Sequence, residues 1–332
     1  MLLAGDIGGT KTDLAVFTSE QGPTVPTRQK RFASGDYPSL EAMTKEYIAD
    51  LDLPITHASF AVAGPVVAGR ASLTNLPWVV AESTLQEALG LDSVSLLNDV
   101  EAMATAVPHL RPNDLRSLRE GEPEQGGTIA LIAPGTGLGQ AFLTWDGSRY
   151  HAYASEGGHT DFGPTTSREA ALLEHLRGRW GRVSYERVCA GRSIPDLYDF
   201  LKEQCDLPES PGVGAELVRV RDRTPVIMAA AFDSHGPDPL CLEAVNLFSS
   251  ILGAQAGNFV LSVYATGGLY IAGGITQRIL PVATGQGKVF LAAFQEKGRL
   301  SPLLSRVPIY IVVESVALVG AAVHGLDSEV AA

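Results

Sequence analysis

The sequence predicts a two-lobed α/β protein, because one strand–glycine turn–strand pattern occurs twice, about one domain apart. The first copy joins apolar residues 2–4 to a strand over residues 13–17. The second copy joins residues 128–134 to residues 140–145 in the same manner. Helical patterns follow each copy, and this alternation is typical of α/β folds with mixed sheets flanked by helices. The repeat therefore indicates two similar lobes, with an active site in the cleft between them.

Each expected element of the first lobe follows from its pattern of apolar residues. Strands are expected at residues 29–33, 58–63 and 93–97. A helix is expected over residues 40–51, because its apolar spacing is helical and Ser39 before it is a favoured N-cap. A second helix, over residues 100–107, closes the unit near Pro108. Polar residues 111–127, rich in Pro, Glu and Gly, are the expected linker to the second lobe.

The second lobe is predicted to be richer in helices. These are expected over residues 167–180, 194–203, 215–221 and 240–261, with buried strands at 268–272 and 308–313. A last helix, over residues 316–325 with Ser315 as its N-cap, is expected to return to the first lobe. We therefore expect a small domain of residues 1–108 plus 315–332 and a large domain of residues 109–314.

The overall composition favours a soluble cytoplasmic protein over a membrane or nucleic-acid-binding one. The chain has 332 residues, of which 45% are hydrophobic and 19% charged, an ordinary globular balance. Its formal net charge of −12 argues against a nucleic acid or an anionic membrane as partner. Cys189, Cys205 and Cys241 lack metal-ligand spacing, which indicates buried thiols in a reducing compartment. We expect no signal peptide and no membrane span.

The first glycine turn has the composition of a phosphate-binding loop. Gly8 and Gly9 lack Cβ atoms, so backbone N–H groups there can approach an oxyanion closely. Thr10 and Lys11 add a hydroxyl and a positive charge. Asp6 lies at the strand end, where a hard cation that bridges phosphate oxygens needs a carboxylate. The alternative is a tight hairpin turn without a ligand, since Asp and Gly are common in turns.

Two later glycine turns extend this interpretation to a nucleotide. Gly135, Thr136 and Gly137 follow a buried strand, so that two opposed loops can clamp a polyphosphate. Gly273 and Gly274 follow another buried strand, and an adenine ring can lie against a turn without side chains. Each turn alone is weak support, because glycine turns also occur in ordinary hairpins and at close helix–strand crossings.

Asn98 and Asp99 are expected where a strand meets a helix, so that both side chains project at the carboxyl end of a strand. In the functional interpretation, Asp99 is a general base that accepts the proton of a substrate hydroxyl, and Asn98 orients that substrate. The alternative is helix capping, for which both residue types are favoured.

Polar residues after the second hairpin favour a sugar as ligand. Glu156 and His159 stand in a run with three glycines, and together they can hold two or three neighbouring hydroxyls. A metal site is disfavoured, because these two donors have no third ligand in register. Glu186 precedes another glycine turn, and its alternative role is an ion pair with Arg187 or Arg182 in solvent.

Six ordered motifs resemble those of the bacterial glucokinase family. They are GDIGGT (5–10), LLND (96–99), PGTGLG (134–139), SEGGH (155–159), YERV (185–188) and YIAGGI (270–275). The similarity extends from about residue 3 to about residue 325. Residues 160–164 contain no cysteine, so the chain resembles the zinc-free glucokinases more than the related repressor–kinase group, which usually carries a cysteine-rich zinc motif.

The resemblance implies the actin-like ATPase (ribonuclease H-like) fold and transfer of the γ-phosphoryl of ATP, with Mg²⁺, to the 6-hydroxyl of glucose. Asp99 would take the proton of that hydroxyl. The sugar would be held by Asn98, Asp99, Glu156, His159 and Glu186. ATP would contact Gly5, Asp6, Ile7, Gly8, Gly9, Thr10, Gly135, Thr136, Gly137, Gly273 and Gly274, with Asp6 bound to Mg²⁺ through water. The family also suggests a homodimer.

Other functions stay open at this point. Another hexose or an amino sugar as acceptor, or polyphosphate as donor, fits the same residues. A sugar-independent actin- or chaperone-like ATPase is disfavoured, because water as acceptor needs no hydroxyl-binding groups. A sugar-responsive transcription regulator is also disfavoured, since the first glycine turn begins at Gly5 and leaves no room before it for a DNA-binding module.

Overall fold

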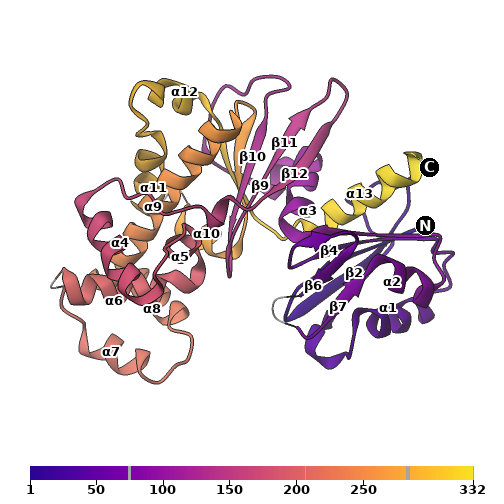
Figure 1. Cartoon of the computed structure of the whole chain (residues 1–332), viewed down its shortest axis with the longest axis horizontal. Helices are drawn as coiled ribbons and strands as arrows, with labels where there is room; N and C mark the ends of the chain where they lie inside the picture. The colour runs from indigo at the N-terminus through magenta and orange to yellow at the C-terminus, as the bar shows by residue number, and fades with distance from the viewer. Residues whose placement is uncertain (74–75, 206, 282–284, 332) are drawn as a thin grey trace. The chain divides into compact units, whose positions relative to one another are not determined.

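The computed structural model describes residues 1–73, 76–205, 207–281 and 285–331, and the chain divides into two compact units. Unit 1 consists of Met1–Asp114, Ala141–Ala154 and Glu314–Ala332, and unit 2 consists of Leu115–Gln140 and Ser155–Val313. Both units mix strands with helices, which confirms the predicted α/β class (Figure 1). The domain boundaries expected from the sequence stay a prediction.

Unit 1 is built on a five-stranded sheet with the order β3-β2-β1-β4-β8. Its strands are β1 (Leu2–Ile7), β2 (Lys11–Phe17), β3 (Arg28–Ala33), β4 (His57–Val62) and β8 (Ser93–Asn98). Strand β1 pairs antiparallel with β2 and parallel with β4, and β4 pairs parallel with β8. Ile7, Val62 and Asn98 therefore stand in one row, at the carboxyl ends of three parallel strands.

Helices cover both faces of this sheet. They are α1 (Leu40–Ala49), α2 (Glu82–Leu89), α3 (Asp99–Ala106) and α13 (Ala317–Ala331). Leu3 of β1 packs into the core with α1 and α2, whereas Leu2 packs into a second core with α3 and α13. Helices α3 and α13 cross closely, because a Cβ atom on Gly320 would overlap the carbonyl group of Ala102. A small sheet comprises β5 (Val66–Val67), β6 (Arg70–Ser72) and β7 (Val79–Ala81).

A six-stranded sheet has the order β12-β11-β10-β13-β14-β9. Its strands are β9 (Leu115–Arg119), β10 (Ile129–Pro134), β11 (Leu138–Trp145), β12 (Tyr150–Ser155), β13 (Gly268–Ile271) and β14 (Ile309–Val312). Strands β10, β13 and β14 are parallel, and β9 pairs antiparallel with β14. The glycine turns at Gly135 and Gly273 therefore follow neighbouring parallel strands.

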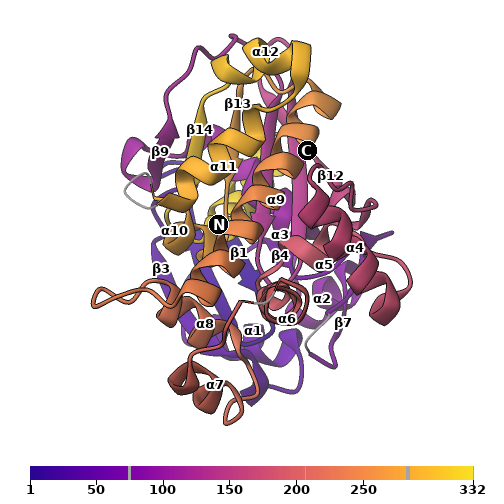
Figure 2. The same ribbon diagram turned by 90° about the vertical axis from the view of Figure 1, so that its left-hand side faces the viewer.

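The helices of unit 2 include the long helix α9. They are α4 (Ser167–Trp180), α5 (Glu186–Cys189), α6 (Ile194–Gln204), α7 (Pro211–Leu217), α8 (Thr224–Ala231), α9 (Pro239–Val263), α10 (Gly274–Ile279), α11 (Gly285–Gln295) and α12 (Ser301–Arg306). Figure 2 shows α9 and α11 side by side. A Cβ atom on Gly253 or Gly257 of α9 would collide with backbone carbonyls of α11, so the glycines permit this close crossing.

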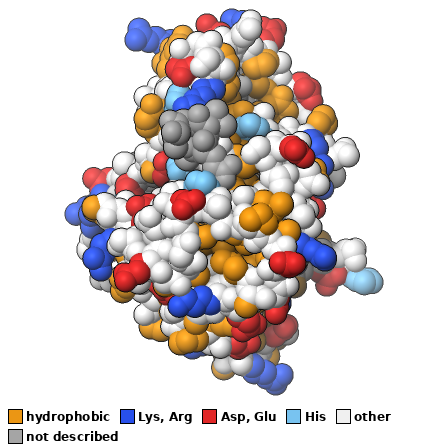
Figure 3. Space-filling view, turned by 90° about the vertical axis from the view of Figure 1, so that its right-hand side faces the viewer, with side chains coloured by type: hydrophobic (Ala, Val, Ile, Leu, Met, Phe, Trp, Pro, Cys, Tyr) orange, Lys and Arg blue, Asp and Glu red, His pale blue; other side chains and the backbone are white. Residues whose placement is uncertain are grey.

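Among the described residues, α9 is the one helix with the length and apolar composition to cross a membrane. However, 78% of its apolar window is buried inside the protein, as in the core helix of a globular domain. On the face that Figure 3 shows, Lys and Arg side chains are scattered among Asp and Glu.

Three of the expected elements are wrong in detail. Residues 111–127 are not merely a linker, because they contain the edge strand β9, whose Arg119 donates to the carbonyl groups of Leu304 and Val307. The helix expected over residues 215–221 is instead α7, which begins four residues earlier with a proline in its first turn. The last helix, α13, begins at Ala317 and not directly after Ser315, whose hydroxyl donates to Asp6. In contrast, Ser39 does cap α1.

Candidate active site

The first glycine turn, residues 8–11, joins β1 to β2 and is closed by its own backbone. The Gly8 N–H donates to the Lys11 carbonyl over 3.0 Å. A Cβ atom on Gly8 would lie 2.8 Å from that carbonyl oxygen, so another residue here would require the turn to shift. The predicted tight turn is therefore confirmed, and its N–H groups lie at the carboxyl end of β1.

The fully buried Ser34 holds the first glycine turn in place. Its hydroxyl donates to the Gly8 carbonyl over 2.8 Å, and its N–H donates to the Thr10 carbonyl over 3.0 Å. The Ser34 and Thr12 hydroxyl oxygens are 3.0 Å apart. Sequence analysis missed Ser34, because a serine after a strand carries no local signal of a partner 26 positions away.

Asp6 lies one residue before the end of β1, in a setting that disfavours its negative charge. Burial is the main cause that raises the pKa of this carboxyl, and the negative charge of Asp13 adds to it. The Ser315 hydroxyl donates to Asp6 Oδ2 over 3.0 Å and opposes that shift. A buried carboxylate of this kind gains from a nearby cation.

Asp99 is the first residue of α3, and the pKa of its carboxyl depends on the charge of Asp6. Burial and then the negative charge of Asp6 raise the pKa of Asp99 to about 6. The Val100 N–H donates to Asp99 Oδ1 over 2.9 Å and partly opposes the shift. A carboxyl with a pKa near neutrality can both lose and accept a proton under physiological conditions.

Asn98 caps helix α3, as the alternative interpretation expected. Its Oδ1 accepts from the N–H groups of Val100, over 2.9 Å, and Glu101, over 3.4 Å. Its Nδ2 donates to the Gly64 carbonyl over 3.0 Å. Capping fixes the side chain beside Asp99, and a hydrogen bond from the Asn98 side chain lowers the pKa of the Asp99 carboxyl, against the effect of burial.

The second glycine turn, residues 135–138, repeats the closure of the first in unit 2. The Gly135 N–H donates to the Gly137 carbonyl over 2.8 Å, and the Gly135 carbonyl accepts from the Gly191 N–H over 2.8 Å. A Cβ atom on Gly135 would meet nothing within 4 Å, so the face of the turn at Gly135 is open. An anionic ligand can approach the backbone at that point.

Gly273 brings the turn after β13 against the second glycine turn. Its φ of +94° is a backbone conformation that favours glycine, and a Cβ atom there would overlap the carbonyl of Pro134. By contrast, a Cβ atom on Gly274 would meet no atom within 4 Å. The two turns therefore lie against each other, and together they present a backbone surface that is free of side chains at Gly135 and at Gly274.

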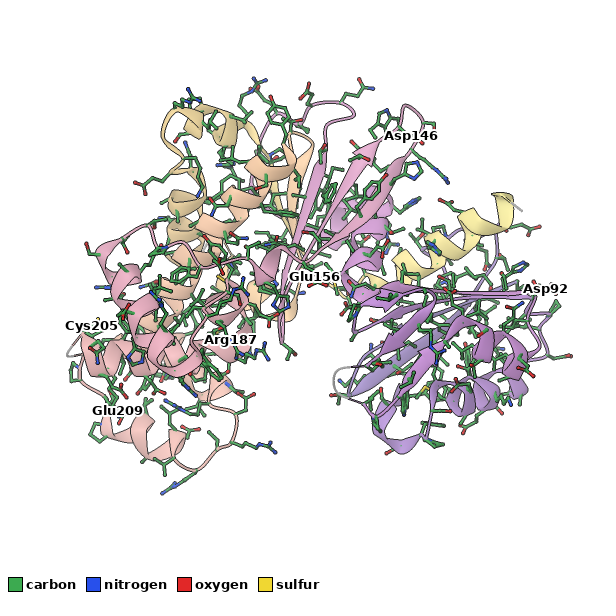
Figure 4. All side chains as sticks on the ribbon, viewed as in Figure 1. Asp92, Asp146, Glu156, Arg187, Cys205 and Glu209 are labelled. Carbon is green, nitrogen blue, oxygen red and sulfur yellow. The ribbon has the colours of Figure 1, made fainter. Side chains whose placement is uncertain are left out.

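Glu156, His159 and Glu186 converge in unit 2. His159 Nε2 lies 3.8 Å from Glu156 Oε2 and 3.9 Å from Glu186 Oε2. Glu156, labelled in Figure 4, follows directly after β12, and its side chain is 80% exposed. Glu186 opens α5, and its side chain is 15% exposed. Two acceptors and an imidazole at these distances can bind a row of hydroxyl groups.

Glu186 also contacts the second glycine turn. Its Oε2 accepts from the Leu138 N–H over 3.2 Å, and its Oε1 pairs with the Arg192 guanidinium. The expected solvent pairing with Arg187 or Arg182 is wrong. The Arg187 guanidinium lies 4.0 Å from the centre of the Trp180 ring.

Arg182 instead ties together the two segments that carry the converging residues. Its guanidinium donates to Asp161 Oδ1 and to the His159 carbonyl, each over 2.7 Å. The Tyr185 N–H donates to the Thr160 carbonyl over 3.0 Å. These bonds fix the His159 backbone relative to the start of α5, although residues 159 and 186 are far apart in sequence.

Comparison with known proteins identifies the family. The glucokinase family model matches residues 3–327. This chain belongs to the glucokinase family. Its activity is therefore the ATP-dependent phosphorylation of glucose. The chain is 39% identical to the glucokinase of Nostoc punctiforme over 97% of this chain and 98% of that one. It is 35% identical to the glucokinase of Cronobacter sakazakii, over 97% and 96% respectively.

Solved structures of glucokinases share this fold. A glucokinase from an Antarctic psychrotroph has a TM-score of 0.83 at 30% identity, with 98% of each chain covered. The glucokinase of Balamuthia mandrillaris, solved in complex with glucose, has a TM-score of 0.78 at 20% identity, over 97% of this chain and 92% of that one. The predicted actin-like ATPase architecture of sugar kinases is thereby confirmed.

The donor set of this glucokinase-family chain fits Mg²⁺ better than a structural metal. Within the described ranges, no three His, Cys, Asp or Glu side chains gather into a group that could hold a metal ion. Mg²⁺ usually keeps several waters and takes only one or two protein carboxylates together with substrate phosphates. Asp6, a partly buried carboxyl whose pKa is raised by burial, matches that requirement.

Proposed function

We propose that Asp99 is the general base of the glucokinase reaction and takes the proton from the 6-hydroxyl of glucose. The observation that carries this proposal is its pKa of about 6, which burial and the charge of Asp6 produce. In the balanced step, the sugar oxygen bonds to the γ-phosphorus and its proton moves to Asp99. The bond from the γ-phosphorus to the bridging oxygen breaks, and ADP leaves.

Four further residues are proposed to bind the sugar hydroxyls. The carboxylates of Glu156 and Glu186 both lie within 4 Å of the His159 imidazole nitrogen, which supports a hydroxyl-binding role for all three residues. Asn98 would orient the sugar beside Asp99, where its Nδ2 is held by the Gly64 carbonyl. Such polar groups stay unpaired when a sugar lacks or inverts a hydroxyl, so this set would discriminate between hexoses.

For ATP we propose the residues named from the sequence. Residues 5–10 and 135–137 would form the two phosphate-binding loops, and the open turn at Gly273 and Gly274 would border the adenosine. Mg²⁺, when held by Asp6 through water, would neutralise phosphate charge. On family resemblance we also propose a cytoplasmic homodimer. Another hexose as acceptor is an outcome of the test below, and a donor other than ATP, such as polyphosphate, would show as weak ADP release with every sugar.

The test is ADP release from ATP·Mg²⁺ with glucose, mannose, fructose, N-acetylglucosamine or no sugar. We expect strong release with glucose and its loss in Asp99→Asn. Asp92→Asn is the matched control, since Asp92 (labelled in Figure 4) is an exposed carboxyl of unit 1. Equal release without sugar would indicate a plain ATPase, and full activity of Asp99→Asn would overturn the base assignment.

A further inference from the structure

The Glu186 carboxylate has a separate partner on each oxygen. Oε1 pairs with Arg192, and Oε2 accepts from the Leu138 N–H of the second glycine turn. His159 Nε2 faces Oε2 from 3.9 Å. The carboxylate lies directly against the turn, because a Cβ atom on Gly137 would lie 2.5 Å from Oε2. The orientation of the carboxylate is therefore set from two sides.

Arg192 is held by the same elements that it connects. It belongs to a short 3-10 turn, Gly191–Ser193, whose Gly191 N–H donates to the Gly135 carbonyl over 2.8 Å. The Ser193 hydroxyl donates to the Glu186 carbonyl over 3.0 Å. The backbone around Arg192 is thus bonded both to the second glycine turn and to the residue that carries the carboxylate.

Charge and burial explain what Arg192 adds. The Glu186 side chain is 15% exposed, whereas the Arg192 side chain is 51% exposed. A carboxylate that is largely removed from water needs compensating donors, and one N–H group supplies only part of them. A guanidinium meets a carboxylate with fixed planar geometry, so Arg192 fixes direction as well as charge.

We propose that Arg192 is a positioning residue that couples the sugar-binding groups to the second glycine turn. By holding Oε1, it keeps Oε2 on the Leu138 N–H, so sugar hydroxyls at Glu186 and phosphates at residues 135–137 affect one another. The inference rests on the proposed roles of Glu186 and of the second glycine turn. Because coupling between ligands is reciprocal, glucose should raise the affinity for nucleotide by the same factor that nucleotide raises the affinity for glucose.

The chain offers a closely matched control pair. Arg179 pairs with Asp196 in unit 2, with side chains 56% and 16% exposed, nearly the values of Arg192 and Glu186. Within the described ranges, neither Arg179 nor Asp196 is bonded to the second glycine turn. Arg179→Met therefore removes an equivalent ion pair without touching the proposed coupling.

The experiment measures binding of AMPPNP·Mg²⁺ with and without glucose, and of glucose with and without AMPPNP·Mg²⁺, by calorimetry on the full chain. We expect a coupling factor of about tenfold in the unchanged protein, within the usual range for linked sites. Arg192→Met should bring it to within about twofold of one and weaken glucose binding about tenfold. Arg192→Lys should recover part of both, and Arg179→Met should change neither.

The proposal is overturned if the unchanged protein shows no coupling, if Arg192→Met keeps it, or if Arg179→Met loses it equally. Thermal melts distinguish a purely structural role of Arg192 from the proposed coupling role. In the structural case, Arg192→Met would lower Tm without a loss of coupling. Failure of the proposed function has a different signature. Glucose-dependent ADP release would then be absent from the unchanged protein, or Glu186→Gln would bind glucose normally.

Discussion

The first and second glycine turns share one local design but are held by different chemistry. Each follows a buried strand and is closed by a backbone bond, from Gly8 to Lys11 in one and from Gly135 to Gly137 in the other. The first is supported by the neutral hydroxyl of Ser34. The second is supported by Glu186, a carboxylate that is itself paired with a guanidinium.

The difference shows where charge is left uncompensated. Beside the first turn, burial raises the pKa of two carboxyls, Asp6 and Asp99. That end of the sheet therefore favours a cation and a proton acceptor. At the second turn the Glu186 carboxylate is already paired with a guanidinium, so it can serve to orient hydroxyls. We expect changes near the first turn to act on kcat and changes near the second to act on KM.

The largest expected effect is on turnover. Asp99→Asn should lower kcat by roughly 10²- to 10⁴-fold, the usual contribution of a general base. Glu156→Gln should instead raise KM for glucose about tenfold, the effect of one lost hydrogen bond to a charged group. Steady-state kinetics of the two variants measure both effects. If Glu156→Gln lowered kcat as much as Asp99→Asn, the assignment of kcat effects to the first turn and KM effects to the second would be wrong.

A second prediction concerns the room for a side chain, which is absent at Gly8 in the first turn and present at Gly135 in the second. Gly8→Ala should destabilise the protein by about 1–3 kcal/mol, because the new methyl group would lie 2.8 Å from the Lys11 carbonyl oxygen. Gly135→Ala should leave Tm unchanged and raise KM for ATP, since its Cβ would enter open space. Urea unfolding and ATP titrations measure both. Equal loss of stability in the two variants would contradict this contrast between the turns.

Ser34→Ala tests the side chain that holds the first turn in place. The change removes the donor to the Gly8 carbonyl and the partner of Thr12, in a buried position. We expect a loss of about 1–3 kcal/mol in the free energy of unfolding. Ser315→Ala, which removes the hydroxyl on Asp6 at a more exposed place, is the comparison variant and should lose less. A larger loss in Ser315→Ala would reverse the assignment of the main support.

The smallest effect is expected in the strand that leaves the second turn. Gln140 is 2% exposed, and neither of its side-chain polar atoms has a hydrogen-bond partner among the described residues. Gln140→Leu should therefore raise the free energy of unfolding by about 1 kcal/mol, since it replaces an unsatisfied amide by an apolar group of similar size. Thermal and urea unfolding check this value. A clear loss of stability in Gln140→Leu would mean that the buried amide is hydrogen-bonded in solution, against this expectation.

Many elements of the fold were predictable because the sequence signals for them are local. The apolar runs of β1 and β10, the glycine turns after them and the cap at Ser39 all carry short-range signals. Asp99 was also found from its place between a strand and a helix. The hydrogen bond from Ser315 to Asp6 was not predicted, because 309 positions separate the two residues. Only the packing of α13 on the sheet of unit 1 brings them together.

Two further features were not predicted, each for its own reason. Strand β9 was taken for a linker because an edge strand with exposed residues has the polar composition of a loop. Arg192 was missed since its partner Glu186 has two arginines closer in the chain, Arg187 and Arg182. Only the fold shows that Arg187 stacks on Trp180 and that Arg182 bonds Asp161.

The most direct test of the central claim is the pH profile of kcat/KM for glucose at saturating ATP·Mg²⁺, in the unchanged protein and in Asp99→Asn. The base must be ionised to accept a proton, and the pKa of Asp99 is raised to about 6. We predict an acid limb that falls about tenfold per pH unit below about pH 6 and that is absent from the residual activity of Asp99→Asn. An unchanged acid limb in Asp99→Asn, or a flat profile down to about pH 4.5 in the unchanged protein, would contradict the account.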